Sequence, residues 1–410
     1  MSTSYNTATL SNGLRVIHRK SHSAIVYCGY QIAVGTRDEA PGEEGLAHFC
    51  EHVTFKGTAR RRSMQVINCL ESIGGEMNAF TNKQATVFYA ALQKEHFTKA
   101  VDLLSDIVFH STYPQHEIDK EVEVICDEIE SYEDTPAELI FDDFENAIFR
   151  GHPLGHNILG TAENVRRFTT ADAVRFTSKY YTPQNAIFFC YGDIEFKRLV
   201  RLIEKHSPKT EAVPLMEATK TTWQGVPTER EIVIQRDTHQ AHVMIGCRGY
   251  DINDPRRMAL YLLNNILGGP GLNARLNIAL RERYGLVYSV ESTMVNYSDT
   301  GMWATYFGCD PKDVQRCRRL IRKELDKVMD KPLSEAQLTA AKRQIKGQIA
   351  LACDNHESFA IDFGKSFLHY GWEKDIQALY DKLDVLTAAD LQEVAKELFK
   401  EENLTTLIYK

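Results

Sequence analysis

The chain has 410 residues, of which 43% are hydrophobic and 25% are charged, and its formal net charge is −8. This length exceeds what one hydrophobic core usually organises, so we expect two or more domains. The mildly acidic balance argues against nucleic acid and against an anionic membrane surface as the main partner.

The sequence gives no sign of export or of membrane insertion. No apolar run approaches the ~20 residues that a membrane-spanning helix needs. The first residues, up to Arg19, are polar and contain the turn pair Asn12-Gly13, without the apolar centre of a signal peptide. The nine cysteines are odd in number and none has C-x-x-C spacing, which favours reduced thiols. We therefore expect a cytoplasmic protein.

The first half of the chain predicts strands followed by helices. We expect strands, in chain order, at residues 14–18, 24–34 and, as a pair, within 77–92. We expect helices at residues 63–73, 96–110 and 117–132, in addition to the helix that begins after Gly45. The pair Gly74-Gly75 ends the helix at 63–73, because glycine readily takes the backbone conformation that stops a helix.

The same order of elements returns in the second half. We expect strands at residues 231–235, 241–247, 286–294 and 302–308, and helices at 255–267, 312–329 and 334–352. Such a return indicates an internal duplication of about 200 residues. A polar stretch with three prolines, residues 205–228, is the expected linker. The predicted domains are residues 1–204 and residues 229–410.

The motif His48-Phe-Cys-Glu51-His52 has the H-x-x-E-H pattern of a metal site. At about 100° per residue, the two histidines and Glu51 share one face of a helix. Two imidazoles at i and i+4 can bind one divalent ion, and the carboxylate between them can hold a water there. Short motifs also arise by chance, so a polar helix face is the alternative interpretation.

The halves differ at this motif. When Gly57 is aligned with Gly268, the two histidines and the glutamate fall opposite Ala259, Leu262 and Leu263. The second half is therefore expected to keep the fold without a metal, and to shape a pocket or bind substrate.

A third ligand is expected from the acidic run around Glu121 and Glu128, because catalytic zinc usually has three protein ligands and one open position. Seven residues apart, these carboxylates share a helix face within about 20° but stand about 10.5 Å apart along the axis. One would bind the ion and the other would hydrogen-bond a ligand or the bound water. The alternative is a solvated acidic helix. Cys50 points away from His48 and is expected to be a core thiol.

Residues 45–58 resemble the active-site helix of the inverzincin metallopeptidases, the M16 family of pitrilysin, insulinase and the mitochondrial processing peptidase. In that family a glutamate about 75 residues beyond the second histidine is the third zinc ligand, and Glu128 stands there. The family's accompanying acid lies seven residues earlier, at Glu121. The resemblance implies that His48, His52 and Glu128 bind one Zn²⁺ per chain and that Glu51 is the general base.

Two further segments resemble the same family. Residues 74–81 are similar to the edge strand that holds an extended peptide by strand addition, which implies substrate contacts at Asn78, Ala79 and Phe80. Residues 281–290 are similar to the second-domain segment that completes the pocket. This resemblance implies that Arg281 and Tyr288 contact the substrate and stabilise the oxyanion.

The resemblance covers nearly the whole chain and implies an α+β fold of two duplicated domains. Each would be a mixed β-sheet with helices mainly on one face, of the LuxS/MPP-like kind. The implied function is a zinc endopeptidase for unfolded peptides in a closed chamber, formed by a homodimer or with a related M16 partner chain. The alternatives are an inactive structural subunit and a zinc hydrolase of non-peptide substrates. Cobalt or manganese could replace zinc, since affinity alone does not decide metal choice.

Overall fold

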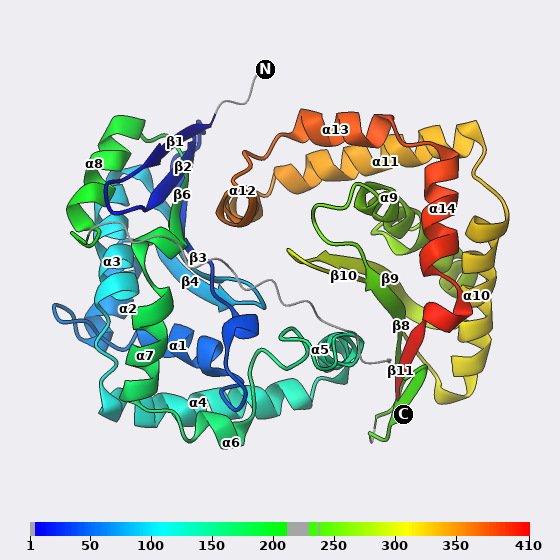
Figure 1. Ribbon diagram of the computed structural model, residues 1–410, viewed down its shortest axis with the longest axis horizontal. Helices are drawn as coiled ribbons and strands as arrows, with labels where there is room; N and C mark the ends of the chain where they lie inside the picture. The colour runs from blue at the N-terminus through cyan, green and yellow to red at the C-terminus, as the bar shows by residue number, and fades with distance from the viewer. Residues whose placement is uncertain (1–4, 211–228, 237) are drawn as a thin grey trace. The chain divides into compact units, whose positions relative to one another are not determined.

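The computed structural model describes residues 5–210, 229–236 and 238–410, which form two compact units (Figure 1). The first unit contains the described residues within 1–130, 156–219 and 352–374. The second contains those within 131–155, 220–351 and 375–410. In the part of the chain that the structure describes, no helix has the length and apolar character needed to cross a membrane.

The first unit is built on a six-stranded sheet with the strand order β1-β2-β6-β3-β5-β4. Neighbouring strands are antiparallel except for β2 and β6, which run parallel. Its strands are β1 (Asn6–Thr9), β2 (Arg15–Arg19), β3 (Ile25–Ile32), β4 (Glu76–Thr81), β5 (Thr86–Gln93) and β6 (Ala186–Tyr191). The strand β4 therefore lies at an edge and pairs with β5 on one side.

The second unit repeats this topology in a five-stranded sheet with the order β7-β11-β8-β10-β9. The parallel pair is β7 and β11, as β2 and β6 are in the first sheet, and its other neighbours are antiparallel. The strands are β7 (Glu231–Ile234), β8 (Ala241–Gly249), β9 (Val287–Asn296), β10 (Gly301–Cys309) and β11 (Thr405–Tyr409). The predicted α+β fold with two duplicated mixed sheets is confirmed.

Helices follow the strands in the same order in both halves. Those of the first unit are α1 (Leu46–Thr54), α2 (Ser63–Glu71), α3 (Phe97–His110), α4 (Gln115–Glu133, whose last three residues belong to the second unit), α6 (Ala162–Val165), α7 (Thr170–Tyr180), α8 (Phe196–His206) and α12 (His356–Tyr370). Those of the second are α5 (Pro136–Ile148), α9 (Arg257–Gly268), α10 (Val314–Asp330), most of α11 (Glu335–Cys353), α13 (Ile376–Asp384) and α14 (Ala388–Leu398). Every predicted strand and helix is present.

Two helices pack in the unit that is formed mainly by the other half of the chain. The helix α5, from the first half of the chain, packs on β8 and β11, and α12, from the second half, packs on β6 and β3. The compact units therefore differ from the expected continuous ranges 1–204 and 229–410. The expected linker also begins too early, because α8 continues to His206. Residues 211–228 of that linker lie outside the described residues.

Aromatic contacts explain why α12 binds the first sheet. The ring of Tyr191 in β6 lies 5.5 Å from that of Phe359 and 6.4 Å from that of Phe363, centroid to centroid. The side-chain amide of Gln31 in β3 donates a hydrogen bond of 2.8 Å to the carbonyl oxygen of Ile361. The helix thus covers apolar and polar groups on this face of the sheet.

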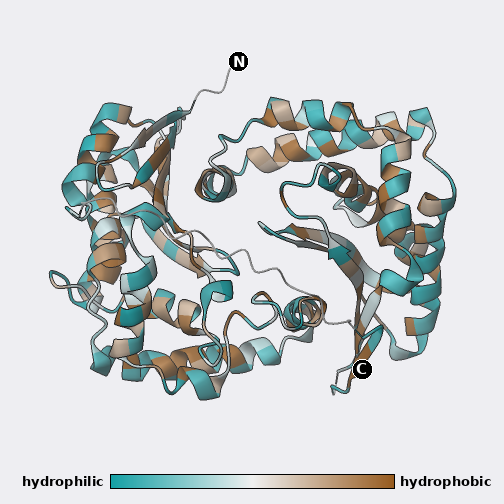
Figure 2. Ribbon diagram, viewed as in Figure 1, coloured by the Kyte–Doolittle hydropathy of each residue, from teal (hydrophilic) through white to brown (hydrophobic). Residues whose placement is uncertain are grey.

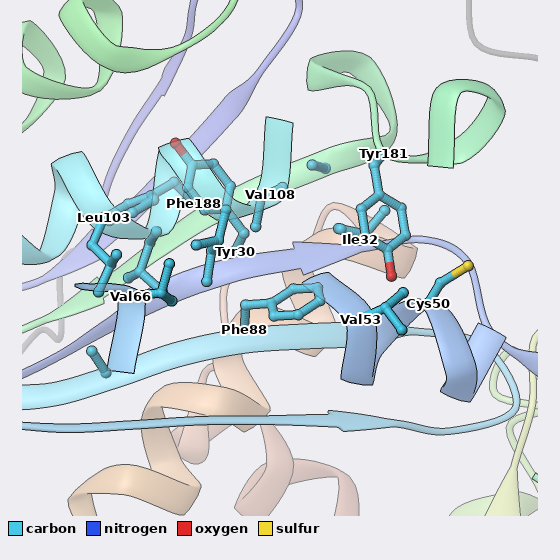
Figure 3. Close-up of a cluster of buried hydrophobic side chains, with 14 of the residues drawn as sticks. Tyr30, Ile32, Cys50, Val53, Val66, Phe88, Leu103, Val108, Tyr181 and Phe188 are labelled. Carbon is cyan, nitrogen blue, oxygen red and sulfur yellow. The ribbon is translucent and has the colours of Figure 1, made fainter. Parts of the chain in front are cut away.

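The other face of the first sheet carries the main core of that unit. Figure 3 shows Tyr30, Phe88 and Phe188, from three neighbouring strands, packed beside Val53 of α1 and Leu103 of α3. All five side chains are fully buried. The strand β6 is almost entirely hydrophobic, whereas α4 and α8 carry both hydrophilic and hydrophobic residues (Figure 2). This pattern fits helices that have one face against the core and one in water.

The loop between α1 and α2 is fastened to α3 by a buried carboxylate. Asp106 is 2% exposed. It accepts hydrogen bonds from Thr58 Oγ1 at 2.8 Å and from Arg60 Nε at 3.1 Å, and it also pairs with Arg61. Because α1 carries the histidine motif, this cluster fixes the position at which the motif helix ends.

Replacing Asp106 should destabilise the first unit. We expect Asp106→Ala to lower the free energy of unfolding by about 2–4 kcal/mol, because the two arginines and the hydroxyl lose a buried acceptor. Urea denaturation followed by fluorescence measures this change. Glu123→Ala is the control, since the Glu123 side chain is 67% exposed, and it should change stability by less than about 0.5 kcal/mol. Equal stabilities of the two variants would contradict the assignment.

Candidate metal centre

The motif helix α1 begins at a point fixed by backbone geometry and by a buried carboxylate. Gly45 has φ 96°, and a Cβ there would lie 2.6 Å from the carbonyl oxygen of Leu159, so a side chain would clash. Glu39 accepts hydrogen bonds from the backbone N–H groups of Gly45 at 3.1 Å and Ala47 at 2.7 Å. His156 Nε2 lies 2.9 Å from Glu39 Oε2. Free N–H groups at the start of the helix thus gain an anionic acceptor.

Three potential metal ligands converge between α1 and α4. Glu128 Oε2 lies 3.2 Å from His52 Nε2, and Glu128 Oε1 lies 3.8 Å from His48 Nε2. Donor atoms of these three residues all lie within 4.8 Å of one another. The Nε2 atoms of both histidines therefore face the same carboxylate.

The donor set and its spacing fit a zinc ion. Zinc bonds to nitrogen and oxygen of about 2.0–2.2 Å place the ligand atoms of a tetrahedral site about 3.4 Å apart. The distances of 3.2 and 3.8 Å from Glu128 to the two histidines lie on either side of that value. Two histidines and one glutamate also match the ligand types of catalytic zinc sites, which leave a fourth position open.

The two histidines differ in their affinity for protons. Burial, assisted by the neighbouring His52, lowers the pKa of His48 to about 4, so His48 is neutral at neutral pH. Burial also acts to lower the pKa of His52, but hydrogen bonds to Glu121 and Glu128 outweigh it and raise the pKa to about 9. A metal ion at His52 would displace that proton, because a histidine ligand must be deprotonated at the bound nitrogen.

Glu121 and Lys56 form a chain of contacts behind His52. Glu121 Oε1 lies 3.0 Å from His52 Nδ1, and Glu121 Oε2 lies 2.5 Å from Lys56 Nζ. Although burial raises the pKa of Glu121, its hydrogen bonds to His52 and Lys56 lower the value below the usual range. An acceptor at Nδ1 keeps the lone pair of Nε2 directed at the metal position. Sequence reasoning missed Lys56, although it follows His52 by four residues.

Glu51 is buried beside these ligands and is held by a hydroxyl. It is 7% exposed, and its Oε2 accepts a hydrogen bond of 2.6 Å from Thr81 Oγ1. Burial raises the pKa of Glu51. Thr81 belongs to the strand segment predicted to bind substrate, but its contact with Glu51 was not predicted. That contact joins the motif helix to the end of β4.

A cavity of about 650 Å³ opens beside this group of residues. Its lining includes the predicted substrate residues Asn78, Ala79 and Phe80 of β4. Since β4 is an edge strand, its outer backbone groups are not used by a neighbouring strand among the described residues. An open edge next to a cavity is the arrangement that strand addition of a peptide requires.

Arg281 and Tyr288 lie in the second unit and are close to each other. Arg281 is in the π-helix η4 (Asn277–Glu282), and Tyr288 is in β9. The guanidinium carbon of Arg281 lies 5.8 Å from the centroid of the Tyr288 ring, and Tyr288 is 84% exposed. Both side chains are therefore available to a ligand, and their contact with a substrate stays a prediction.

Residues that were not expected to bind metal are buried in the structure. Cys50 is fully buried and lies outside the group of possible ligands, as predicted. The helix α9, which follows β8 as α1 follows β3, carries Ala259, Leu262 and Leu263 at 2%, 0% and 1% exposure. These positions of the second half pack into a core and carry no metal-binding group.

Two duplicated α+β units, one with two histidines and a glutamate around a possible metal position, are typical of a metallohydrolase. Residues 15–162 match the family model described as Insulinase (Peptidase family M16). Residues 167–345 match the model described as Peptidase M16 inactive domain, which agrees with the absence of the motif there. The chain belongs to peptidase family M16.

Individual relatives are similar to this chain over most of their own length. An uncharacterized zinc protease of Bacillus subtilis, YmxG, is 32% identical over 98% of this chain and 97% of its own length. An uncharacterized zinc protease of Streptomyces coelicolor is 32% identical over 95% of this chain and 86% of its own. The crystal structure of a protease from Helicobacter pylori has the same fold, with a TM-score of 0.89 and 23% identity over the whole of both chains.

Removing the acceptor behind His52 should weaken metal binding without removing a ligand. We expect Glu121→Gln to lower zinc affinity about 10- to 100-fold, because His52 loses the carboxylate that orients its ring. Lys56→Met should act in the same direction with a smaller effect. Competition with a chromophoric chelator measures both affinities. Glu123→Gln, the control on the same helix, should bind zinc like the wild type, and an unchanged affinity in Glu121→Gln would remove it from this role.

Proposed function

We propose that this chain is a zinc-dependent endopeptidase that hydrolyses unfolded peptides or oligopeptides held as an extended strand. The observation that carries the proposal is the convergence of His48, His52 and Glu128 with Glu51 buried beside them. The names of the relatives, zinc proteases from several bacteria, support the same class of reaction.

In this proposal His48, His52 and Glu128 would hold a zinc ion, which would supply Lewis-acid chemistry to the scissile carbonyl and to water. Glu51 removes a proton from the attacking water and delivers it to the amine that leaves when the C–N bond breaks. Burial raises the pKa of Glu51, which makes its carboxylate a stronger base than a solvated one. Thr81 holds the Glu51 carboxylate in position through the hydrogen bond described above.

The edge strand β4 would bind the peptide. Backbone hydrogen bonds at an open strand edge recognise extended chains of any sequence, while alternate side chains enter the neighbouring cavity. The cavity lining by Asn78, Ala79 and Phe80 supports this mode. Arg281 and Tyr288 would contact the substrate from the second unit, and two copies of the chain, or this chain and a related one, would close around it.

Two other functions fit the structure less well. An inactive structural subunit has no need for two histidines and a glutamate gathered beside a buried, hydrogen-bonded carboxylate, so this grouping supports an enzyme. A zinc hydrolase of a non-peptide substrate has no need for an open strand edge beside the metal position. Chelator-sensitive cleavage of a quenched peptide library would separate the three functions.

Removing the proposed base should separate chemistry from metal binding. We expect Glu51→Gln to retain zinc and to lose about 10²- to 10⁴-fold or more in kcat, because the amide cannot accept the proton. Zinc content by plasma mass spectrometry and cleavage of a quenched peptide are measured on the same sample. Full activity, or loss of the metal, would contradict the role assigned to Glu51.

Removing a ligand should instead lower the metal content. His52→Ala and Glu128→Gln should each reduce the zinc-to-protein ratio after dialysis, since two ligands hold zinc much less tightly than three. The control is His116→Ala, because the His116 side chain is 73% exposed on the same α4 helix. A variant with an unchanged ratio would take its residue out of the ligand set.

A further inference from the structure

Two cysteines face each other across the middle of the first sheet. Cys28 lies in β3 and Cys190 lies in β6, about 160 positions later in the sequence. The antiparallel register of these central strands places the two residues directly opposite each other. Both side chains are fully buried and both thiols are free. Neither thiol takes part in the proposed peptidase mechanism.

The hydrogen bonds of the sheet show which kind of pair the cysteines form. In antiparallel strands, opposite residues alternate between pairs that exchange backbone hydrogen bonds and pairs that do not. The N–H of Ala33, just beyond β3, donates a hydrogen bond of 2.8 Å to the carbonyl oxygen of Asn185, which is opposite in the same register. The N–H of Lys94, just beyond β5, donates to the carbonyl oxygen of Ala24 at 3.0 Å. Odd-numbered positions of β3 therefore bond to β6 and even-numbered positions bond to β5, so Cys28 forms a non-hydrogen-bonded pair with its opposite residue.

At a non-hydrogen-bonded pair the two backbones approach each other most closely. The Cα atoms are about 4.5 Å apart, and both side chains point to the same face of the sheet. The next such pair along the strands, Tyr30 and Phe188, has its ring centroids 5.0 Å apart in the core (Figure 3). A disulfide needs Cα atoms about 4.4–6.8 Å apart. The thiols of Cys28 and Cys190 can therefore be joined with both strands in place.

The other cysteines that the described strands contain have no thiol opposite them. Cys247 in β8 faces Trp303 in β10. Cys309, at the end of β10, faces Ala241 on one side and Val287 on the other. Directly opposed cysteines are thus a feature of β3 and β6 among these strands.

We propose that Cys28 and Cys190 form a reversible intramolecular disulfide, a redox-sensitive cross-link that joins β3 to β6 and stabilises the first unit. The co-reactant is the disulfide of a low-molecular-weight thiol, such as oxidised glutathione. One cysteine thiolate attacks a sulfur of this disulfide and expels a thiolate, which takes up a proton. The second cysteine then attacks the mixed disulfide and expels the other small thiol. Two protein thiols are oxidised while one small disulfide is reduced to two thiols, so atoms and electrons balance.

Burial determines when this bond can form. It raises the pKa of Cys28 to about 12, and it raises the pKa of Cys190 as well. Because the thiolate and not the thiol attacks a disulfide, the folded first unit protects its reduced thiols. Oxidation therefore proceeds when the sheet opens, or before the sheet has formed. Once formed, the bond closes a loop of about 160 residues, and it stabilises the fold because it restricts the unfolded chain.

The test uses the full-length chain in glutathione buffers that range from reducing to oxidising, with urea below the unfolding transition so that the sheet opens transiently. After free thiols have been alkylated, mass spectrometry of a digest should find the linked Cys28 and Cys190 peptides in the oxidised samples only. Dithiothreitol should remove the link. Calorimetry of the same samples should show a melting temperature that is higher by about 5 °C or more in the oxidised protein. Cys190→Ala should lose both the link and this rise.

Cys247→Ala is the matched control, because it removes an equally buried strand thiol, 2% exposed, that has no cysteine opposite it. This variant should keep the linked peptides and the rise in melting temperature. The absence of linked peptides from the oxidised wild type overturns the proposal, and so does a link that leaves the melting temperature unchanged or lower. The linked peptides are detected in the wild type, so the test remains decisive if Cys190→Ala does not fold. Neither measurement requires peptidase activity, and the proposal is therefore independent of the proposed function.

Discussion

His52 stands between two carboxylates of one helix, and the functional site depends on this contact. Glu121 and Glu128 are two turns apart on α4, and they approach opposite nitrogens of a single imidazole on α1. Glu121 alone would be costly to bury, because charge loses hydration in the protein interior. Together, and with Lys56 behind Glu121, they compensate one another and fix the distance between the two helices. The proposed metal position, the place of Glu51 and the cavity all depend on that distance.

Much of this site could be predicted from the sequence because it depends on local spacing. The shared face of His48, Glu51 and His52 follows from helical period, and so does the separation of the two glutamates. Contacts between residues that are far apart in the sequence could not be predicted from their spacing. Thr81 reaches Glu51 across 30 positions, and His156 reaches Glu39 across 117. No spacing rule predicts either pair, so only the folded chain shows that Glu51 and the start of the motif helix are held by distant residues.

The fold was predictable to a similar degree and for a similar reason. Strand and helix patterns recur in both halves, and the order of the recurring elements indicated the duplication. The exchange of α5 and α12 leaves no local pattern, because an amphipathic helix can cover either sheet. The duplication also shows how the second unit differs from the first. In α9, the helix that corresponds to α1, Leu262 and Leu263 are buried at the positions where a metal site would need ligands. At these positions the second unit has core side chains and no metal-binding groups.

The exchanged helix α12 also affects the order in which the protein can fold during synthesis. The last strand of the first sheet, β6, ends at Tyr191, whereas the helix that covers that sheet ends at Tyr370. At about 5–20 residues per second, the ribosome needs on the order of ten to thirty seconds to make the chain between them. Throughout that interval Tyr191 and its neighbours on the sheet have no partner from α12. The nascent first unit therefore leaves this aromatic face of its sheet uncovered by α12 until the second half has been made.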